Sequence, residues 1–219
     1  MHWRQGSSGI GYAIANSFLK NGAKVIIAGR NIEKLNYAKE KLIQEMKCEK
    51  KAVEVLELDI SSVHEIEKVF SVFLKNRKID IFVNNAGTNG GDLFPNTLET
   101  DYDKVLNTNL KGMYFVSQEI AKYMVENKIK GNILNITSSS AMRSGISPYI
   151  ISKWGERSLT LGMAKKYLPY GIVVNGLAPE PTLTPMLKQM GDENLHLEYS
   201  PSKRYATSEE MGEFSNNFG

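Results

Sequence analysis

Tyr149 and Lys153 carry the residue types and the spacing that point most directly to chemistry. They lie four residues apart just after Pro148. Because proline is favoured in the first turn of a helix, both side chains are expected on one helix face. A phenol has a reference pKa of about 10, and a nearby ammonium group favours its ionised form. The pair therefore predicts proton transfer near neutral pH, with Tyr149 as the acid or base.

The same spacing occurs three times in the chain, so its context has to separate function from coincidence. Tyr37–Lys41 lies in the middle of a helical segment, and Tyr199–Lys203 contains a proline, which discourages a helix. Tyr149–Lys153 alone follows a strand that ends in serines. Ser138, at that strand end, could donate a hydrogen bond to a carbonyl oxygen as negative charge develops there. The alternative interpretation is a structural pair on a helix face.

A second candidate site is the glycine-rich stretch GSSGIG close to the start of the chain. Glycine lets backbone amides approach a pyrophosphate, and the helix expected from its end would direct a positive pole at that charge. The sequence therefore predicts a phosphate-binding turn made of Gly6, Ser7, Ser8, Gly9, Ile10 and Gly11. The alternative is a flexible turn, because no apolar strand precedes these glycines.

The strand ends that follow carry further residues at ligand-binding positions. In dinucleotide-binding folds an acidic residue after the second strand contacts the ribose 2′-hydroxyl, whereas an arginine accommodates a 2′-phosphate. This chain has Gly29 and then Arg30, which predicts NADP(H) as the preferred cofactor and NAD(H) as the second choice. The alternative is that Arg30 only caps a strand exit. Candidates at the next two strand ends are Asp59, Ile60, Asn85, Ala86 and Gly87, although Asn-Ala-Gly is also a common turn sequence.

Alternating apolar and amphipathic segments predict the elements that position these residues. Strands are expected at Lys24–Ala28, Ala52–Leu58, Ile79–Asn84, Gly131–Thr137 and Ile172–Ala178. Apolar residues at three- and four-residue spacing predict helices over Ile10–Asn21, Ile32–Met46, Val63–Asn76, Tyr102–Asn127 and Pro148–Leu168. This order is typical of an α/β fold with a doubly wound parallel sheet in three α/β/α layers, which binds ligands at the carboxyl ends of its strands.

Length and composition favour a single globular domain over residues 1–219. The chain is 42% hydrophobic and has a formal net charge of +3, with both signs interspersed. This balance predicts neither a nucleic-acid-binding nor a membrane-binding surface. Cys48 is the single cysteine, and neither a secretory leader nor an 18-residue apolar run is recognisable. A cytoplasmic location is therefore expected, and no metal site is predicted.

Six motifs follow one another in the order and roughly the spacing of the short-chain dehydrogenase/reductase family, which the chain resembles over nearly all of its length. They are GSSGIG, NNAG, the asparagine of NTNLKG, the serine after GNILNIT, YIISK and VNGLAP. The resemblance implies a Rossmann-like domain that moves a hydride between the nicotinamide of NAD(P)(H) and a carbonyl or alcohol carbon of a small molecule. It also implies a homo-oligomer. Within the family, the chain looks most like 3-oxoacyl carrier-protein reductases and sugar-acid or polyol dehydrogenases.

The same resemblance implies roles for individual residues. Tyr149 would be the acid or base, Ser138 would orient the substrate oxygen, and Lys153 would bind the ribose and favour the phenolate. Asn109 would organise a water molecule in the proton relay. Ser139 is the alternative to Ser138, because the count from serine to tyrosine is short for many members. The implied cofactor contacts are those of Asp59 with the adenine, residues 85–87 with the ribose side and Thr184 with the carboxamide, together with Ile60 and Pro179.

Departures from the family pattern predict an incomplete chain. Arg4-Gln5 stands where members have Thr-Gly, and MHWRQ is too short for the buried strand that normally precedes the glycine turn. ATSEEMGEF, from Ala206, predicts a last helix, after which the family's final strand is expected to be missing. Glu180 also stands where members have glycine. The alternative function is therefore an inactive or fragmentary relative that binds a dinucleotide weakly or acts only as a partner subunit.

Overall fold

The structure, a computed structural model, describes residues 2–5, 7–75, 77–90, 94–187, 196–198 and 200–218. Residues 2–5 and 187 are described by their backbone alone. The chain divides into two compact units. Leu58–Ala178 form the central unit, and His2–Glu57 together with Pro179–Gly219 form the split unit.

The split unit is built on parallel strands joined by helices. Its strands run in the order β3-β2-β1 and are β1 (His2–Gln5), β2 (Val25–Gly29) and β3 (Val53–Glu57). Helix α1 (Gly9–Lys20) connects β1 to β2, and α2 (Ile32–Met46) connects β2 to β3. The apolar residues of β2 are buried, as expected for a strand between two parallel neighbours.

Strand β1 corrects the prediction that the chain lacks a first strand. His2–Gln5 pair in parallel with β2, with His2 opposite Val25 and Gln5 opposite Ala28. The prediction was wrong because it required an apolar run. A parallel ladder is held by backbone N–H and C=O groups, which every residue except proline supplies. A short segment beside the apolar β2 therefore completes the ladder without a strand signal of its own.

Helix α7 (Ser208–Ser215) packs against α1 in the split unit. The Thr207 side chain accepts the N–H of Glu210, and the Glu210 carboxylate accepts the N–H of Thr207, which satisfies two donors at the helix start. Gly212 permits the close contact, because a Cβ there would lie 2.7 Å from the carbonyl oxygen of Ala13. The helix predicted near this end of the chain is thus present.

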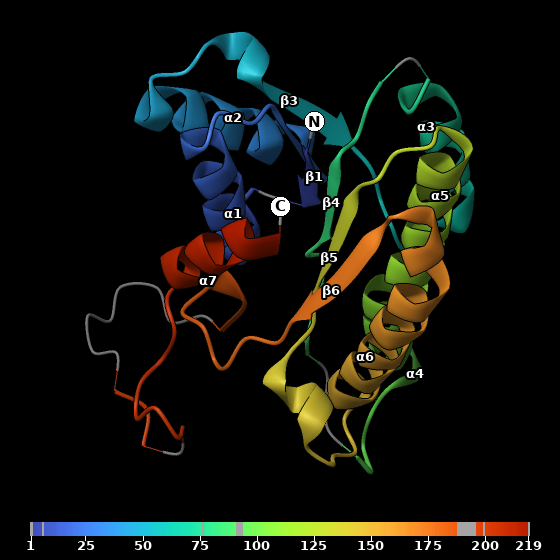
Figure 1. The fold of residues 1–219 in the computed structure, drawn as a ribbon. Coiled ribbons are helices and arrows are strands. Elements are labelled where there is room, and N and C mark those ends of the chain that lie inside the picture. Colours follow the sequence, from blue (N-terminus) through green and yellow to red (C-terminus); the bar gives the residue numbers. More distant parts are fainter. Residues whose placement is uncertain are drawn as a thin grey trace. The chain divides into compact units, whose positions relative to one another are not determined.

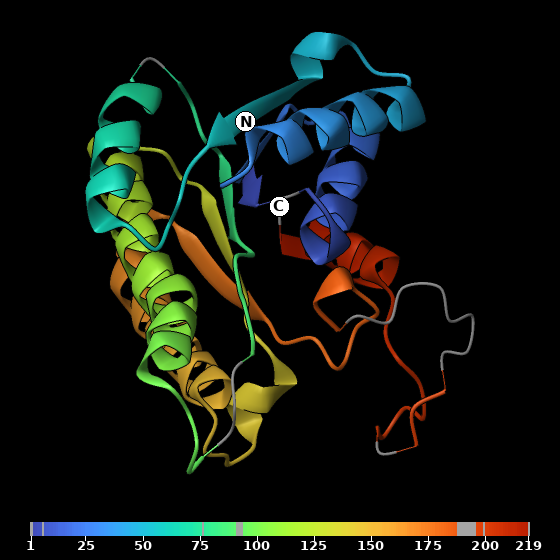
Figure 2. The ribbon, with the colours of Figure 1, turned by 180° about the vertical axis from the view of Figure 1, so that it is seen from behind.

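The central unit has the same α/β construction. Its parallel strands run in the order β4-β5-β6 and are β4 (Ile81–Asn84), β5 (Asn132–Ile136) and β6 (Val173–Leu177). Its helices are α3 (Val63–Phe73), α4 (Glu99–Leu106), α5 (Met113–Glu126) and α6 (Pro148–Tyr167). Helices α3, α5 and α6 stand together on one side of these strands (Figure 1, Figure 2). Strand β6 is the last strand among the described residues.

The helix predicted over Tyr102–Asn127 is interrupted, so the prediction of one continuous helix was wrong. A π-helical segment, η2 (Asn107–Gly112), separates α4 from α5. At Gly112 a Cβ would lie 2.7 Å from the carbonyl oxygen of Ile60, closer than any side chain permits. The spacing of apolar residues over a long segment predicts a helix, but it does not show where one turn of that helix widens into a π-helical turn. Such π segments are frequent at functional sites.

The other predicted elements agree with the structure to within three residues at either end. Their ends have local causes. Ser62 accepts the N–H of Glu65 at the start of α3, and Gly22 and Gly171 have φ angles of 79° and 73° just after helical segments, a conformation that favours glycine. None of the helices in the described part of the chain is long and apolar enough to cross a membrane.

Candidate active site

Tyr149 and Lys153 stand in the first two turns of α6. Ser147 caps this helix by accepting the N–H of Ile150 at 3.2 Å, and Pro148 occupies the first turn. Lys153 is buried, and its Nζ lies 5.6 Å from the centroid of the Tyr149 ring. The four-residue spacing thus brings an ammonium group beside the phenol ring.

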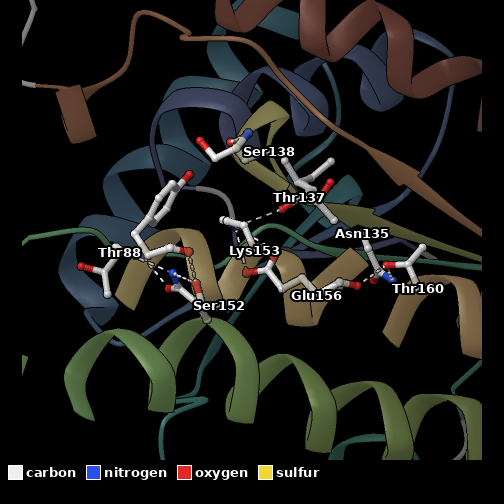
Figure 3. Close-up of polar contacts among 12 residues, drawn as sticks. Thr88, Asn135, Thr137, Ser138, Ser152, Lys153, Glu156 and Thr160 are labelled. Atoms are coloured by element: carbon white, nitrogen blue, oxygen red, sulfur yellow. Dashed lines mark hydrogen bonds and ion pairs between the residues drawn. The ribbon is translucent and has the colours of Figure 1, made fainter. Parts of the chain in front are cut away.

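A buried carboxylate holds the ammonium of Lys153. Nζ lies 2.9 Å from both carboxylate oxygens of Glu156, three residues further along α6, and donates a hydrogen bond to Oε2. It also lies 3.5 Å from the carbonyl oxygen of Ile136 at the end of β5. Figure 3 shows Lys153 and Glu156 pointing toward each other beside Thr137. While Glu156 is ionised, the pair carries no net charge.

Burial raises the pKa of the Glu156 carboxyl from 4.5 to about 7, and the attraction of Lys153 opposes this rise. Only 1% of the residue is exposed. Its Oε1, although close to Nζ, accepts no hydrogen bond from the described residues. Because burial disfavours the charged form of an acid, this carboxyl changes its protonation state near neutral pH.

Asn109, inside η2, joins the loop after β4 to α6. Its fully buried side chain accepts the N–H of Thr88 at 2.8 Å and donates to the Thr88 carbonyl at 2.9 Å and to Ser152 Oγ at 3.0 Å. Ser152 Oγ donates in turn to the carbonyl of Tyr149 at 2.7 Å. Figure 3 shows Thr88 and Ser152 on either side of this network. Asn109 therefore fixes the helix turn that carries Tyr149, and its role in a proton relay stays a prediction.

Two serines follow β5, and both are buried. Ser138 Oγ accepts the N–H of Ser140 at 3.1 Å, and Ser139 Oγ accepts from the Arg143 guanidinium at 3.3 Å. In these bonds both hydroxyls act as acceptors, so each could donate its own proton to a substrate oxygen. Ser138 remains the predicted residue and Ser139 its alternative.

The remaining predicted residues of the central unit lie after β3 and β4. The Asp59 carboxylate accepts the backbone N–H of Ser61 at 2.9 Å and its hydroxyl at 2.8 Å, which shapes the turn into α3. Ile60 is buried, and its side chain is part of the core beside Gly112. Residues 85–87 are half-buried after β4. These positions agree with strand-end sites, but the Ile60 side chain is committed to packing.

The glycine-rich turn lies at the start of α1 in the split unit, and Gly6 lies outside the described residues. Gly9 has a φ of 55°, and a Cβ there would lie 3.3 Å from Thr184 Cγ2, so the turn and Thr184 are brought together. The Ser8 side chain makes no capping bond, and the first helical turn has no acidic residue. Exposure falls along the turn from Ser7 and Ser8 through Ile10 to the buried Gly11. The helix start therefore suits an anion.

Arg30 stands directly after β2, and its side chain is exposed. The next residue, Asn31, starts α2 by accepting the N–H of Lys34 at 2.8 Å. Pro179, at the start of the second segment of the split unit, is buried. Arg30 thus lies at the strand end where a 2′-phosphate is expected in dinucleotide-binding folds.

Comparison with known proteins decides the family. The family model of short chain dehydrogenases matches residues 5–195. The chain belongs to the short-chain dehydrogenase family. It is 31% identical to gluconate 5-dehydrogenase of Gluconobacter oxydans over 214 residues, which cover 94% of this chain and 81% of the relative. It is 33% identical to the 3-oxoacyl-[acyl-carrier-protein] reductase FabG of Chlamydia pneumoniae over 200 residues, which cover 90% and 78%.

A solved structure of ElxO with NADP bound is similar to this dehydrogenase with a TM-score of 0.84 and 27% identity, covering 99% of this chain and 90% of that one. The predicted Rossmann-like α/β fold is therefore confirmed. The prediction of an NAD(P)-dependent oxidoreductase of this family is confirmed as well.

Sequence reasoning missed three residues around the tyrosine of this dehydrogenase. Glu156 had a signal, because it follows Lys153 by three residues and such helix neighbours face each other. Ser152 and Thr88 had none, since one acts through a hydroxyl on the helix and the other through its backbone. Their partners became visible only with the three-dimensional contacts.

Truncating Asn109 is expected to destabilise the protein. Asn109→Ala removes the partner of the Ser152 hydroxyl and of both backbone groups of Thr88, so we expect the free energy of unfolding to fall by about 2 kcal/mol. Chemical denaturation measures the change. Asn127→Ala, which removes one side-chain hydrogen bond of an exposed residue at the end of α5, is the control and should cost less than about 0.5 kcal/mol. If both variants lost the same small amount of unfolding free energy, water would replace the hydrogen bonds of Asn109.

The burial of Glu156 predicts a pH dependence of stability. An acid whose pKa is raised on folding stabilises the folded state below its unfolded pKa of 4.5, and this contribution is lost as the pH rises through about 7. We expect the free energy of unfolding to fall by on the order of 2 kcal/mol between about pH 5 and about pH 8. Urea unfolding at both pH values measures it.

Glu156→Gln should abolish most of that pH dependence, because the group no longer titrates. The exposed Glu126 at the end of α5 offers the matched control, and Glu126→Gln should keep the wild-type dependence. The same pH dependence in Glu156→Gln as in wild type would assign it to other groups.

Proposed function

We propose that this dehydrogenase transfers a hydride between NADP(H) and the carbonyl or secondary alcohol carbon of a small molecule. The observation that carries the proposal is the Lys153 ammonium 5.6 Å from the Tyr149 ring centroid, on the helix that comes after β5 and the two buried serines behind it. A phenol beside a cation is suited to exchange a proton with a substrate oxygen.

The reaction assigns one task to each residue of the candidate site. When bound, NADPH supplies the hydride that adds to the carbonyl carbon. Tyr149 donates its phenolic proton to the carbonyl oxygen, and Ser138 donates a hydrogen bond to the same oxygen while charge develops on it. Lys153 stabilises the phenolate that remains. In the opposite direction, the phenolate takes the proton of the alcohol.

The split unit supports the choice of cofactor. The start of α1 offers backbone N–H groups without a capping side chain or an acidic residue in the first turn, which suits a pyrophosphate. The exposed Arg30, with Gly29 in place of an acid, favours NADP(H) over NAD(H). Thr184 lies against Gly9 of the same turn. Solved relatives with NADP or NADPH bound agree with this preference.

We also propose that residues 1–219 act as one dinucleotide-binding domain that forms a homo-oligomer. The family match over residues 5–195 supports the first part. Large apolar side chains are exposed on α5 and α6, and a second copy of the chain that covered them would remove apolar surface from water. They include Tyr114, Trp154 and Leu161. Sedimentation of the purified chain would give the number of subunits, and a monomer at working concentration would contradict the second part.

Two measurements test the proposed function. NADPH binding to the folded state is expected to raise its stability by about 3 kcal/mol at a hundred times Kd, which appears as a higher melting midpoint. Consumption of NADPH with a panel of ketones, including a keto sugar acid and a 3-oxoacyl thioester, identifies the substrate. No shift of the midpoint at saturating NADPH would favour the inactive relative instead.

A further inference from the structure

Glu156 is a buried ionisable group for which the proposed reaction has no task. It is 1% exposed, and both of its carboxylate oxygens lie 2.9 Å from the Lys153 ammonium. Replacing a buried ion pair by apolar residues is often neutral or stabilising. Stability is therefore a weak reason for an ion pair here, and an effect on Lys153 itself is the stronger one.

Apart from Lys153, the labelled side chains around Glu156 in Figure 3 are neutral. Figure 3 shows Asn135 and Thr137 at the end of β5 and Thr160 one turn further along α6. Asn135 donates to Thr160 Oγ1 at 2.9 Å, and Thr160 donates to the backbone carbonyl of Glu156 at 2.7 Å. Of the described residues, Lys153 supplies the charge that acts on this carboxylate. The two groups therefore form an isolated electrostatic pair.

We propose that Glu156 is a positioning residue that holds the Lys153 ammonium and offsets its charge, and thereby sets how readily the Tyr149 phenol ionises. The inference rests on the proposed function, in which Tyr149 exchanges the proton. One cation acts on both groups, because Nζ lies 2.9 Å from the carboxylate and 5.6 Å from the centroid of the phenol ring.

The charges give the sign of the effect. When Glu156 is ionised, the attraction of the ammonium for a phenolate is opposed by the nearby carboxylate. When Glu156 is protonated, the ammonium acts alone and favours the phenolate. Burial raises the pKa of Glu156 to about 7, so both states are populated near neutral pH. The ionisation of Tyr149 is therefore coupled to that of Glu156.

The test measures the ionisation of Tyr149 directly, by ¹³C NMR of protein labelled at the tyrosine Cζ atoms. Tyr149→Phe identifies the resonance. Glu156→Gln keeps the shape of the side chain and one acceptor for Nζ but removes the charge, so we expect the acid dissociation constant of the Tyr149 phenol to rise about tenfold. Glu156→Leu removes the acceptor too and gives a second measurement of the same rise. Glu126→Gln removes an equal charge from an exposed position and leaves the constant unchanged.

Each outcome decides something. A dissociation constant within about twofold of wild type in both Glu156 variants overturns the inference, because the carboxylate then has no effect on Tyr149. If the constant rises but the wild type turns over no substrate, the inference stands and the proposed function fails. If wild-type turnover depends on Tyr149 but neither Glu156 variant changes the constant, only the inference fails. In the active enzyme, the Glu156→Gln effect appears as a shift of the pH profile of kcat to lower pH, which a merely structural role would not produce.

Discussion

Replacing Tyr149 by phenylalanine is expected to lower kcat about 10²- to 10⁴-fold, the usual contribution of a positioned general acid. The change removes one oxygen atom, and with it the proton, from a ring that stays beside Lys153. Fold and cofactor binding should persist, because the Tyr149 backbone carbonyl still accepts from Ser152. Steady-state consumption of NADPH measures kcat, and the melting midpoint with and without NADPH measures folding and binding.

The chain offers its own control for this substitution. Tyr37 and Lys41 repeat the Tyr-x-x-x-Lys spacing on α2, where Tyr37 is 74% exposed. Tyr37→Phe makes the same chemical change without a neighbouring strand end and should leave kcat within about twofold. Turnover that survives Tyr149→Phe at the wild-type rate would remove Tyr149 from the reaction.

The sequence predicted most helices and strands of the fold well, but it did not predict strand β1 or the π-helical turn η2. The apolar residues of β2 and β5 are buried, and such burial leaves a continuous hydrophobic signal in the sequence. Strand β1 left no such signal, because His2–Gln5 are held by pairing with β2 rather than by their own composition. The π-helical turn η2 ends at Gly112, which lies against Ile60. The spacing of apolar residues does not predict such a contact between distant segments.

The candidate site divides in the same way. Tyr149 and Lys153 were predictable because helix geometry fixes the relation of residues four apart. Glu156 obeys the same geometry, but only the structure reveals that its helix face is buried and that its carboxylate meets Lys153 rather than water. The Asn109 contacts with Thr88 join positions far apart in sequence, so no spacing rule could give them. The sequence therefore predicted which side chains are neighbours on one helix, but it did not predict which of them are buried or which distant residues they contact.

Replacing Arg30 by alanine is expected to raise the Kd for NADPH about 10- to 100-fold and to change the Kd for NADH by less than about threefold, because a charge-assisted bond to a 2′-phosphate has no counterpart in NADH. The structure leaves Arg30 exposed at the carboxyl end of β2, with Gly29 rather than an acid before it. Titration of each dinucleotide, followed by the melting midpoint, measures both constants.

Charge alone could produce part of this effect, since any lost cation weakens the attraction for an anionic dinucleotide. Lys20→Ala separates the two causes, because Lys20 is exposed at the end of α1 and its loss changes the net charge equally. A general effect would be similar in both variants and would weaken as salt is added. A specific contact would appear only in Arg30→Ala and only for NADPH. If Arg30→Ala raised the Kd for NADPH and the Kd for NADH by the same factor, this arginine would have a structural role at the end of β2 and would not select the cofactor.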